Sequence, residues 1–115
     1  MIQEGHIVLF RFPQTDQSTG KMRPALVIRK CPGPFEDWMI CMISTQLTQQ
    51  IIGLDEIIKP GDSDFGGSGL KLASLFRVSR LAVVDKSILM GTIGEIYSDR
   101  LSRIKTAISS WIQNT

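Results

Sequence analysis

FRFPQTDQSTGKMRPALVIRK, residues 10–30, joins two segments of strand-like composition through a charged, polar connection. The flanking segments, residues 5–12 (GHIVLFRF) and 24–28 (PALVI), are rich in the β-branched and aromatic residues that favour strands. Between them stand proline, glycine and small polar residues, which are typical of turns. The stretch therefore predicts two strands joined by a long loop, and loops held by a rigid scaffold often carry function.

The loop holds groups suited to binding and cleaving a phosphodiester. It contains one carboxylate, Asp16, and two cations, Lys21 and Arg23, the second of which stands at the start of the next strand. Three hydroxyls accompany them, namely Thr15, Ser18 and Thr19. A guanidinium can bind two phosphate oxygens and a carboxylate can accept a proton. Asp16 could equally bond to the backbone of its own turn, and the residues alone leave these two roles open.

The remainder of the chain predicts further short strands. Residues 37–44 (DWMICMIS) are apolar on both faces, which is typical of a central, covered strand. Residues 72–77 and 79–84 are predicted as two strands or as one bent strand, and residues 89–96 as a last strand or an extended lead into a helix. Residues 59–69 (KPGDSDFGGSG) are predicted to be a flexible loop, which could be a substrate lid, a partner-binding loop or a plain surface excursion.

The chain ends in an amphipathic helix. Ser98 is a plausible N-cap, and apolar residues then recur at helical spacing. This face consists of Leu101, Ile104, Ile108, Trp111 and Ile112. The opposite face carries Arg100, Arg103 and Lys105, which we expect to be solvated. About six short strands followed by one helix predict a mainly β domain, α+β by content, built as a small, strongly bent barrel.

Length and composition indicate one domain, residues 1–115, with an ordinary hydrophobic fraction of 43%. Lysine and arginine number 13 against 11 acidic residues, so the net charge of +2 does not by itself indicate a nucleic-acid-binding protein. Any phosphate recognition must come from local clusters. These are Lys21, Arg23, Arg29 and Lys30 on one segment, and Arg77, Arg80 and Lys86 on another.

No apolar stretch reaches the roughly 20 residues that span a bilayer, and the N-terminus lacks the pattern of a signal peptide. We therefore expect a cytoplasmic protein with no membrane association and with Cys31 and Cys41 reduced. The chain has one histidine, His6, and no CxxC motif, so we expect neither a metal site nor a cofactor. His6 itself is predicted to be a satisfied core or edge residue.

The pattern TDxSxxKxRPA over residues 15–25 resembles the opening of the PemK/MazF family of toxin endoribonucleases. The likeness continues in order through residues 43–46 (ISTQ), residues 74–86 (SLFRVSRLAVVDK) and a turn at residues 91–94. The resemblance covers nearly the whole chain. It implies a small SH3-like barrel of the PemK/MazF/CcdB type with a C-terminal amphipathic helix.

The resemblance places Arg23 and Ser44 in the catalytic set, and the chemistry of the loop adds Asp16. Arg23 would stabilise charge on the phosphate, Ser44 would bind a phosphate oxygen beside it, and Asp16 is the leading candidate base. Arg77 corresponds to a second arginine that some family members use on the scissile phosphate, although the acidic residue two positions later in those members is Ser79 here. The RNA-binding set is predicted to be Arg77, Lys21, Ser18, Thr45, Phe65 and Arg80.

A family member would be a metal-independent endoribonuclease, an mRNA interferase toxin of a type II toxin-antitoxin system. It would cut single-stranded RNA to leave a 2′,3′-cyclic phosphate and a 5′-hydroxyl, act as a homodimer and be inhibited by a cognate antitoxin. Two alternatives stay open. One is a non-catalytic, growth-inhibiting interaction protein of the same fold, such as a CcdB-like gyrase binder using Trp111 and Ile112. The other is a degenerate member that binds only RNA or antitoxin.

Overall fold

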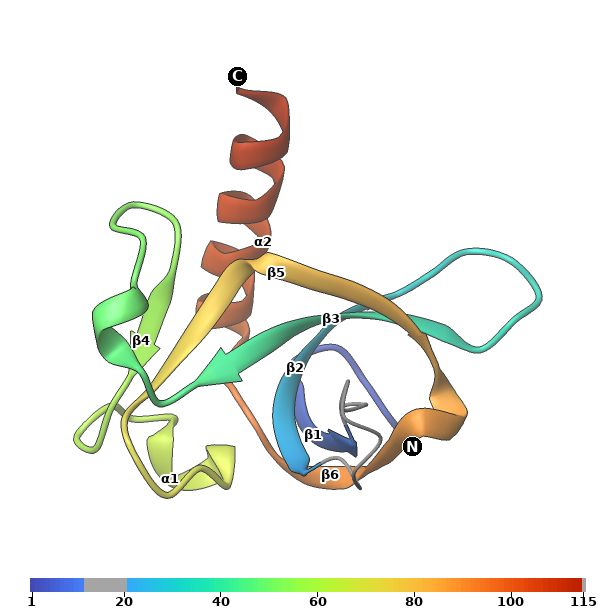
Figure 1. Ribbon diagram of the computed structural model, residues 1–115, viewed down its shortest axis with the longest axis horizontal. Coiled ribbons are helices and arrows are strands. Elements are labelled where there is room, and N and C mark those ends of the chain that lie inside the picture. Colours follow the sequence, from blue (N-terminus) through green and yellow to red (C-terminus); the bar gives the residue numbers. More distant parts are fainter. Residues whose placement is uncertain (12–20, 115) are drawn as a thin grey trace.

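The apolar runs of the sequence form one antiparallel sheet, and the last segment forms a helix (Figure 1). The structure is a computed structural model and describes residues 1–11 and 21–114. Its strands are β1 (His6–Arg11), β2 (Met22–Lys30), β3 (Asp37–Ser44), β4 (Glu56–Ile58), β5 (Ser74–Asp85) and β6 (Leu89–Glu95). Its helices are α1 (Phe65–Ser68) and α2 (Ser98–Gln113), with short 3-10 turns η1 (Leu47–Gln49) and η2 (Lys86–Ile88).

The strands follow the order β4-β5-β3-β2-β1-β6, and every neighbouring pair is antiparallel. β3 lies inside the sheet between β2 and β5, as its apolar sequence predicts. The fold is mainly β with a C-terminal helix, so the predicted class is confirmed. The sheet is not a closed barrel, however, because β4 and β6 form its two edges and the strands curve without joining (Figure 1).

Both faces of the sheet are apolar, because the strands contain consecutive apolar residues and consecutive strand residues point to opposite sides. Ile7 belongs to the cluster that packs under α2, whereas its neighbour Val8 belongs to the cluster on the other face. The first cluster includes the fully buried Leu26, Phe76 and Ile104. The second cluster consists of Val8, Phe10, Ala25, Val27, Trp38, Ile40 and Leu89. These two cores hold the central strands in a fixed register.

β5 is one continuous strand with a bend, which confirms one of the two predicted alternatives. Its pairing with β3 passes from Cys41↔Leu81 to Met42↔Arg77. Residues 78–80 of β5 therefore lie between two positions that are adjacent on β3. An insertion of this kind bends a strand and increases its twist, and beyond it the first residues of β5 pair with β3 on one side and with the short edge strand β4 on the other.

α2 is where the sequence predicts it, with one boundary shifted and part of its apolar face uncovered. Tyr97 rather than Ser98 occupies the N-cap position, and no side chain caps the helix there. Ile104 and Ile108 are buried, as predicted. Trp111 and Ile112 are 46% and 63% exposed because the C-terminal end of the helix extends beyond the sheet (Figure 1). The apolar stripe is thus covered by the core over only its N-terminal part.

Arg100 is buried, contrary to the expectation that it is solvated. Its Nε and Nη2 donate to the two carboxylate oxygens of Asp64 at 2.7 and 3.0 Å. Nη1 donates to Glu56 and to the carbonyl oxygen of Ile57, both at 3.1 Å, and Nη2 also donates to Asp62 at 3.2 Å. These contacts match the five N–H groups of a guanidinium, so the charge is buried with every donor used.

Residues 59–69, predicted as a flexible loop, are held in place on two sides. Arg100 binds the carboxylates of Asp62 and Asp64, and the backbone at Gly67 and Gly69 lies against β6. A Cβ atom at Gly94 of β6 would collide with the Gly67 carbonyl oxygen. The glycine-rich composition therefore serves close backbone packing here, a use that composition alone does not distinguish from flexibility.

We predict that Gly94→Ala lowers the free energy of unfolding by more than about 1 kcal/mol, because the added methyl group has no space between β6 and the backbone at Gly67. Gly66→Ala is the matched control, since a Cβ there meets nothing within 4 Å. Urea denaturation measures both variants. Equal unfolding midpoints for the two variants would contradict this packing.

A second prediction concerns acid stability. Hydrogen bonds from Arg100 hold the pKa of Asp64 below its ordinary value of 3.8. A carboxylate with a lowered folded-state pKa stabilises the fold above pH 3.8 and loses that contribution as the pH falls through the lowered value. In Asp64→Asn the free energy of unfolding should therefore decrease less steeply below about pH 4 than in the wild type. In Asp99→Asn, a substitution at an exposed position, it should decrease as steeply as in the wild type. Denaturation curves between pH 2 and 7 test this, and an unchanged acid limb in Asp64→Asn would refute it.

Candidate active site

Arg23 and Ser44 lie at the same end of the two central strands. Ala25 of β2 pairs with Met42 of β3, and the strands are antiparallel. The pairing ends there, and Arg23 and Ser44 each lie two residues beyond it, at the same end of the two strands. Because residues two apart on a strand share a face, both side chains are on the side that carries Ala25 and Met42. Strand pairing therefore brings together two residues that are 21 positions apart in the sequence.

A pocket of about 370 Å³ opens at this point. It is lined by Met22, Arg23, Pro24, Ile43, Ser44, Thr45, Gln46, Leu70, Lys71, Leu72 and Ser74. Three residues predicted for the site, Arg23, Ser44 and Thr45, thus share one pocket. Arg23 is exposed, and its guanidinium is chemically suited to an anion that enters from solvent.

The Ser44 hydroxyl has a fixed acceptor role and a free donor. The backbone N–H of Gln46 donates to Ser44 Oγ at 3.0 Å, which places the hydroxyl in the turn that follows β3. A hydroxyl that accepts one hydrogen bond can still donate its own proton. Ser44 is therefore able to donate to an anion in the pocket beside Arg23, and Thr45 supplies a second exposed hydroxyl.

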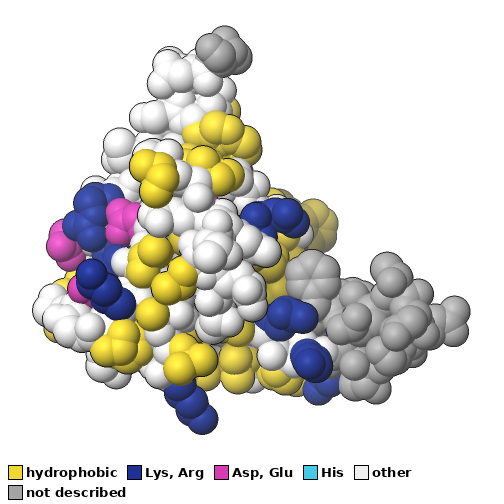
Figure 2. Space-filling model, turned by 60° about the vertical axis from the view of Figure 1, so that its left-hand side comes forward, with side chains coloured by type: hydrophobic (Ala, Val, Ile, Leu, Met, Phe, Trp, Pro, Cys, Tyr) yellow, Lys and Arg dark blue, Asp and Glu magenta, His cyan; other side chains and the backbone are white. Residues whose placement is uncertain are grey.

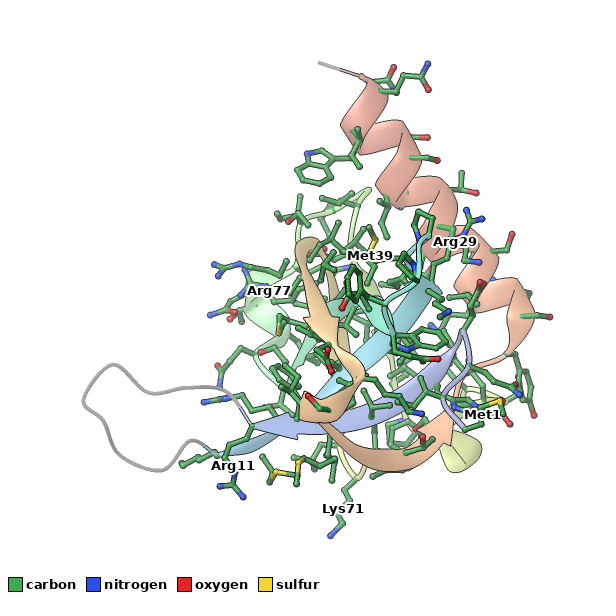
Figure 3. The ribbon with its side chains drawn as sticks, turned by 90° about the vertical axis from the view of Figure 1, so that its right-hand side faces the viewer. Met1, Arg11, Arg29, Met39, Lys71 and Arg77 are labelled. Carbon is green, nitrogen blue, oxygen red and sulfur yellow. The ribbon has the colours of Figure 1, made fainter. Side chains whose placement is uncertain are left out.

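Arg77 lies next to this pocket without lining it. It pairs with Met42, whereas Leu75, two residues earlier on β5, pairs with Ser44. Arg77 Nη1 donates to the Gln49 side-chain oxygen at 3.0 Å, and the side chain is labelled in Figure 3 at the surface of the molecule. The structure thus sets this second arginine one pleat away from Ser44.

The other predicted RNA contacts are placed as follows. Lys21 is exposed directly before β2, and Arg80 is exposed on β5 outside the pocket. Phe65 is the first residue of α1 and packs against the apolar cluster under α2, so it is not presented by a free loop. Asp16 and Ser18 lie outside the described residues.

The charge distribution supports local rather than bulk recognition. On the face shown in Figure 2, lysine and arginine side chains gather on the right-hand side of the molecule. On the left-hand side of the same view, basic side chains alternate with acidic ones. The ion pairs of Arg100 and Arg103 with Glu56 are of this alternating kind, so those arginines are neutralised by neighbours.

Sequence reasoning missed the wall of the pocket formed by Leu70, Lys71, Leu72 and Ser74. Lys71 projects outward in Figure 3, and Leu72 is 63% exposed. The signal that would have found them is the pairing of Ser44 with Leu75, because it brings the residues before β5 to the end of β3. That pairing depends on the β3–β5 register, which no local pattern gives.

The remaining titratable candidates have structural surroundings. His6 Nδ1 accepts a hydrogen bond from the backbone N–H of Gln3 at 3.1 Å, as expected for a satisfied edge histidine. Cys31 and Cys41 are free thiols. Burial, together with the charge of Asp55, raises the pKa of Cys41 to about 12, so this thiol is not a nucleophile near neutral pH.

Across residues 1–11 and 21–114, histidine, cysteine and acidic side chains form no group of three or more that could hold a metal ion. Within the same ranges, no helix has the length and apolar character needed to cross a membrane.

The fold and the pocket together define a small β protein with a guanidinium and two hydroxyl groups lining one pocket. The sequence matches the model of the PemK-like, MazF-like toxins of type II toxin-antitoxin systems over residues 3–112. Because this match spans almost the entire sequence, the chain belongs to that family. Comparison with curated protein sequences gives no match.

Solved structures share the fold at low sequence identity. Mycobacterium tuberculosis toxin MazF-mt6 superposes with a TM-score of 0.68 at 15% identity, covering 94% of this chain and 96% of that one. A mycobacterial endoribonuclease in complex with its cognate antitoxin gives 0.71 at 14% identity, covering 100% and 98%. A MazE-MazF structure from Deinococcus radiodurans gives 0.63 at 16% identity, covering 99% and 97%. At these identities the likeness establishes the fold.

The pocket geometry predicts that inorganic phosphate binds at Arg23. Titration with phosphate, followed by amide chemical shifts, should perturb Ser44 and Thr45 in a saturable way, because a guanidinium and hydroxyl donors converge there. Arg23→Ala should abolish the perturbation. Arg29→Ala is the control, since Arg29 is exposed on the same strand but lies outside this pocket. Equal shifts in wild type and Arg23→Ala would rule out the anion site.

Proposed function

We propose that this protein is the toxin of a type II toxin-antitoxin system and that it cleaves single-stranded RNA in the cytoplasm without a metal ion. The observation that carries the proposal is the shared pocket of Arg23, Ser44 and Thr45 in a chain of the PemK/MazF family. A fold alone does not define a reaction, so the proposal depends on the residues of the pocket as well as on the family. The pocket supplies a guanidinium and two hydroxyl groups, which can stabilise negative charge on a phosphate.

In the proposed reaction the 2′-hydroxyl oxygen attacks the adjacent phosphorus. A bond forms between phosphorus and O2′, and the bond between phosphorus and O5′ breaks. The products are a 2′,3′-cyclic phosphate and a 5′-hydroxyl. One proton must leave O2′ and one must reach O5′, while negative charge grows on the non-bridging oxygens.

Arg23 is assigned to the non-bridging oxygens. Its planar guanidinium offers two parallel N–H donors to a phosphate and keeps its charge at any working pH. Ser44 is assigned to the same phosphate, where its hydroxyl proton can bond to a second oxygen while the Gln46 N–H holds Oγ in position. Asp16 is assigned on its sequence position as the base that removes the O2′ proton, and Arg23 is also the candidate donor of the proton that O5′ receives.

The basic and polar residues around the pocket are assigned to the RNA backbone on either side of the cleaved phosphate. Arg77 is suited to a neighbouring phosphate because it lies one pleat from Ser44 and retains N–H donors beyond the one that bonds to Gln49. Lys21, Ser18 and Arg80 are further proposed contacts. Such basic contacts add affinity that does not depend on base sequence.

We further propose that the protein acts as a homodimer and is inhibited by a cognate antitoxin. Two of the structural neighbours are described as complexes, one an endoribonuclease with its cognate antitoxin and one a MazE-MazF assembly. An acidic antitoxin segment would compete with RNA for Arg23, because a carboxylate and a phosphate both suit a guanidinium fork.

A second candidate function is a non-catalytic interaction protein of the same fold. The exposed Trp111 and Ile112 at the free end of α2 favour it, since exposed aromatic and aliphatic side chains are typical of protein interfaces. The two functions differ in what happens to RNA. A gyrase binder would leave RNA intact and would lose its target on substitution of Trp111.

We predict that wild-type protein cleaves a mixed-sequence RNA oligonucleotide in the presence of EDTA and that Arg23→Ala lowers the rate by about 10²–10³-fold, as expected for loss of one charge-stabilising donor group. Arg29→Ala should cleave at the wild-type rate. Circular dichroism checks that both variants are folded. Undiminished cleavage by Arg23→Ala would refute the assignment, and intact RNA with folded wild type would favour the second candidate.

A further inference from the structure

We propose that Arg100 is a positioning residue for the Arg23–Ser44 pocket, which it does not touch. The wall of that pocket is formed by residues 70–74. Arg100 binds the chain that precedes this wall, including strand β4, and β4 pairs with the strand that follows the wall. The inference rests on the function proposed above. Arg100, on helix α2, would then affect substrate binding without contacting the substrate.

The first anchor precedes the wall in sequence. Arg100 binds Asp62 and, through two hydrogen bonds, Asp64, which stands at the N-cap position of α1. Asp64 is 3% exposed, so this ion pair is shielded from solvent. A bidentate pair between a guanidinium and a buried carboxylate fixes orientation as well as distance.

α1 transmits this position to the wall. The Ser68 hydroxyl donates to the carbonyl oxygen of Phe65 at 2.6 Å and accepts from the backbone N–H of Leu70 at 3.1 Å. Gly69 adopts a left-handed backbone conformation with φ of 76° and packs directly against the Ile93 carbonyl. Hydrogen bonds within α1 and at its end therefore connect Asp64 to Leu70, the first residue of the wall.

The second anchor is β4, which precedes the wall in sequence and pairs with the strand that follows it. Arg100 also donates to Glu56 and to the Ile57 carbonyl of β4. β4 pairs with the start of β5, with Ile58 opposite Ser74. The Ser74 hydroxyl in turn donates to the carbonyl oxygen of Leu72 at 2.8 Å. Arg100 therefore holds the chain before the wall directly and the chain after it through the pairing of β4 with β5.

Arg103 provides a natural control for this role. It lies one turn along α2 and also pairs with Glu56, at 3.0 Å, and with Asp99. Its side chain is 54% exposed, whereas that of Arg100 is 9% exposed. Among the described residues, Arg103 makes no hydrogen bond to Asp62, Asp64 or the Ile57 carbonyl, so it reaches only one of the two anchors.

The experiment compares Arg100→Lys with Arg103→Lys. Lysine keeps the charge but cannot reproduce the five-donor fork of arginine. Steady-state kinetics on an RNA oligonucleotide give kcat and KM, and hydrogen exchange measured by mass spectrometry reports on peptides covering residues 70–74 and, as a reference, β3. The exchange measurement does not depend on RNA cleavage.

For Arg100→Lys we expect faster exchange in residues 70–74 with β3 unchanged, and a fall in kcat/KM of about tenfold, carried by KM. KM carries the change because the wall contacts bound RNA equally in the ground and transition states. A role in folding alone would instead lower the active fraction, reducing kcat at constant KM. Arg103→Lys should match the wild type in both measurements.

Unchanged exchange in residues 70–74, or a kcat/KM within twofold of wild type despite faster exchange, would overturn the inference. If Arg100→Lys does not fold, Asp62→Asn decides by the same readouts, because it weakens only one of the five bonds at a partly exposed carboxylate. If the folded wild type cleaves no RNA, the proposed function fails, and the exchange result alone then decides whether Arg100 anchors the wall.

Discussion

The pairing of β2 with β3 is the constraint on which the rest of the molecule depends. It brings Arg23 and Ser44 to the same end and the same face of the sheet, and one residue of slip would turn one of these side chains to the other face. The register is held because both faces of the two strands are buried, with Leu26 in one core and Ala25 in the other. The two apolar clusters therefore do more than stabilise the fold, since they align the groups of the candidate site.

A second layer of organisation surrounds this pair. The open end of the sheet leaves a pocket whose third side comes from the chain between β4 and β5. That chain is held by a buried charge, which is costly unless every donor is paired, as it is at Arg100. Charge in this protein thus has two separate roles. The neutralised arginine fixes the backbone, and the exposed arginine at the strand end is available to a ligand.

Much of the fold could be predicted from sequence because its signals are local. The apolar run at residues 37–44 predicts an inner strand, and the spacing of Ile104 and Ile108 predicts the buried face of the helix. The failures involve distant partners. Arg100 has the sequence context of a solvated helix residue, and only the approach of Asp64, 36 positions away, shows that it is buried. The sheet edges likewise depend on which strands meet, so a closed barrel was predicted where the sheet stays open.

The candidate site likewise has a part that the sequence predicts and a part that depends on distant strand pairing. Arg23, Ser44 and Thr45 could be named from the loop, the strand end and the family pattern, whereas the wall at residues 70–74 required the β3–β5 register.

The central claim, that Arg23 and Ser44 act on one phosphate, is tested most directly by a double-mutant cycle on kcat/KM with Arg23→Ala, Ser44→Ala and the double variant. Residues that act as a unit give strongly non-additive losses, so the double variant should lose little more than Arg23→Ala alone. Losses that multiply independently would show that the two side chains do not meet at a common anion.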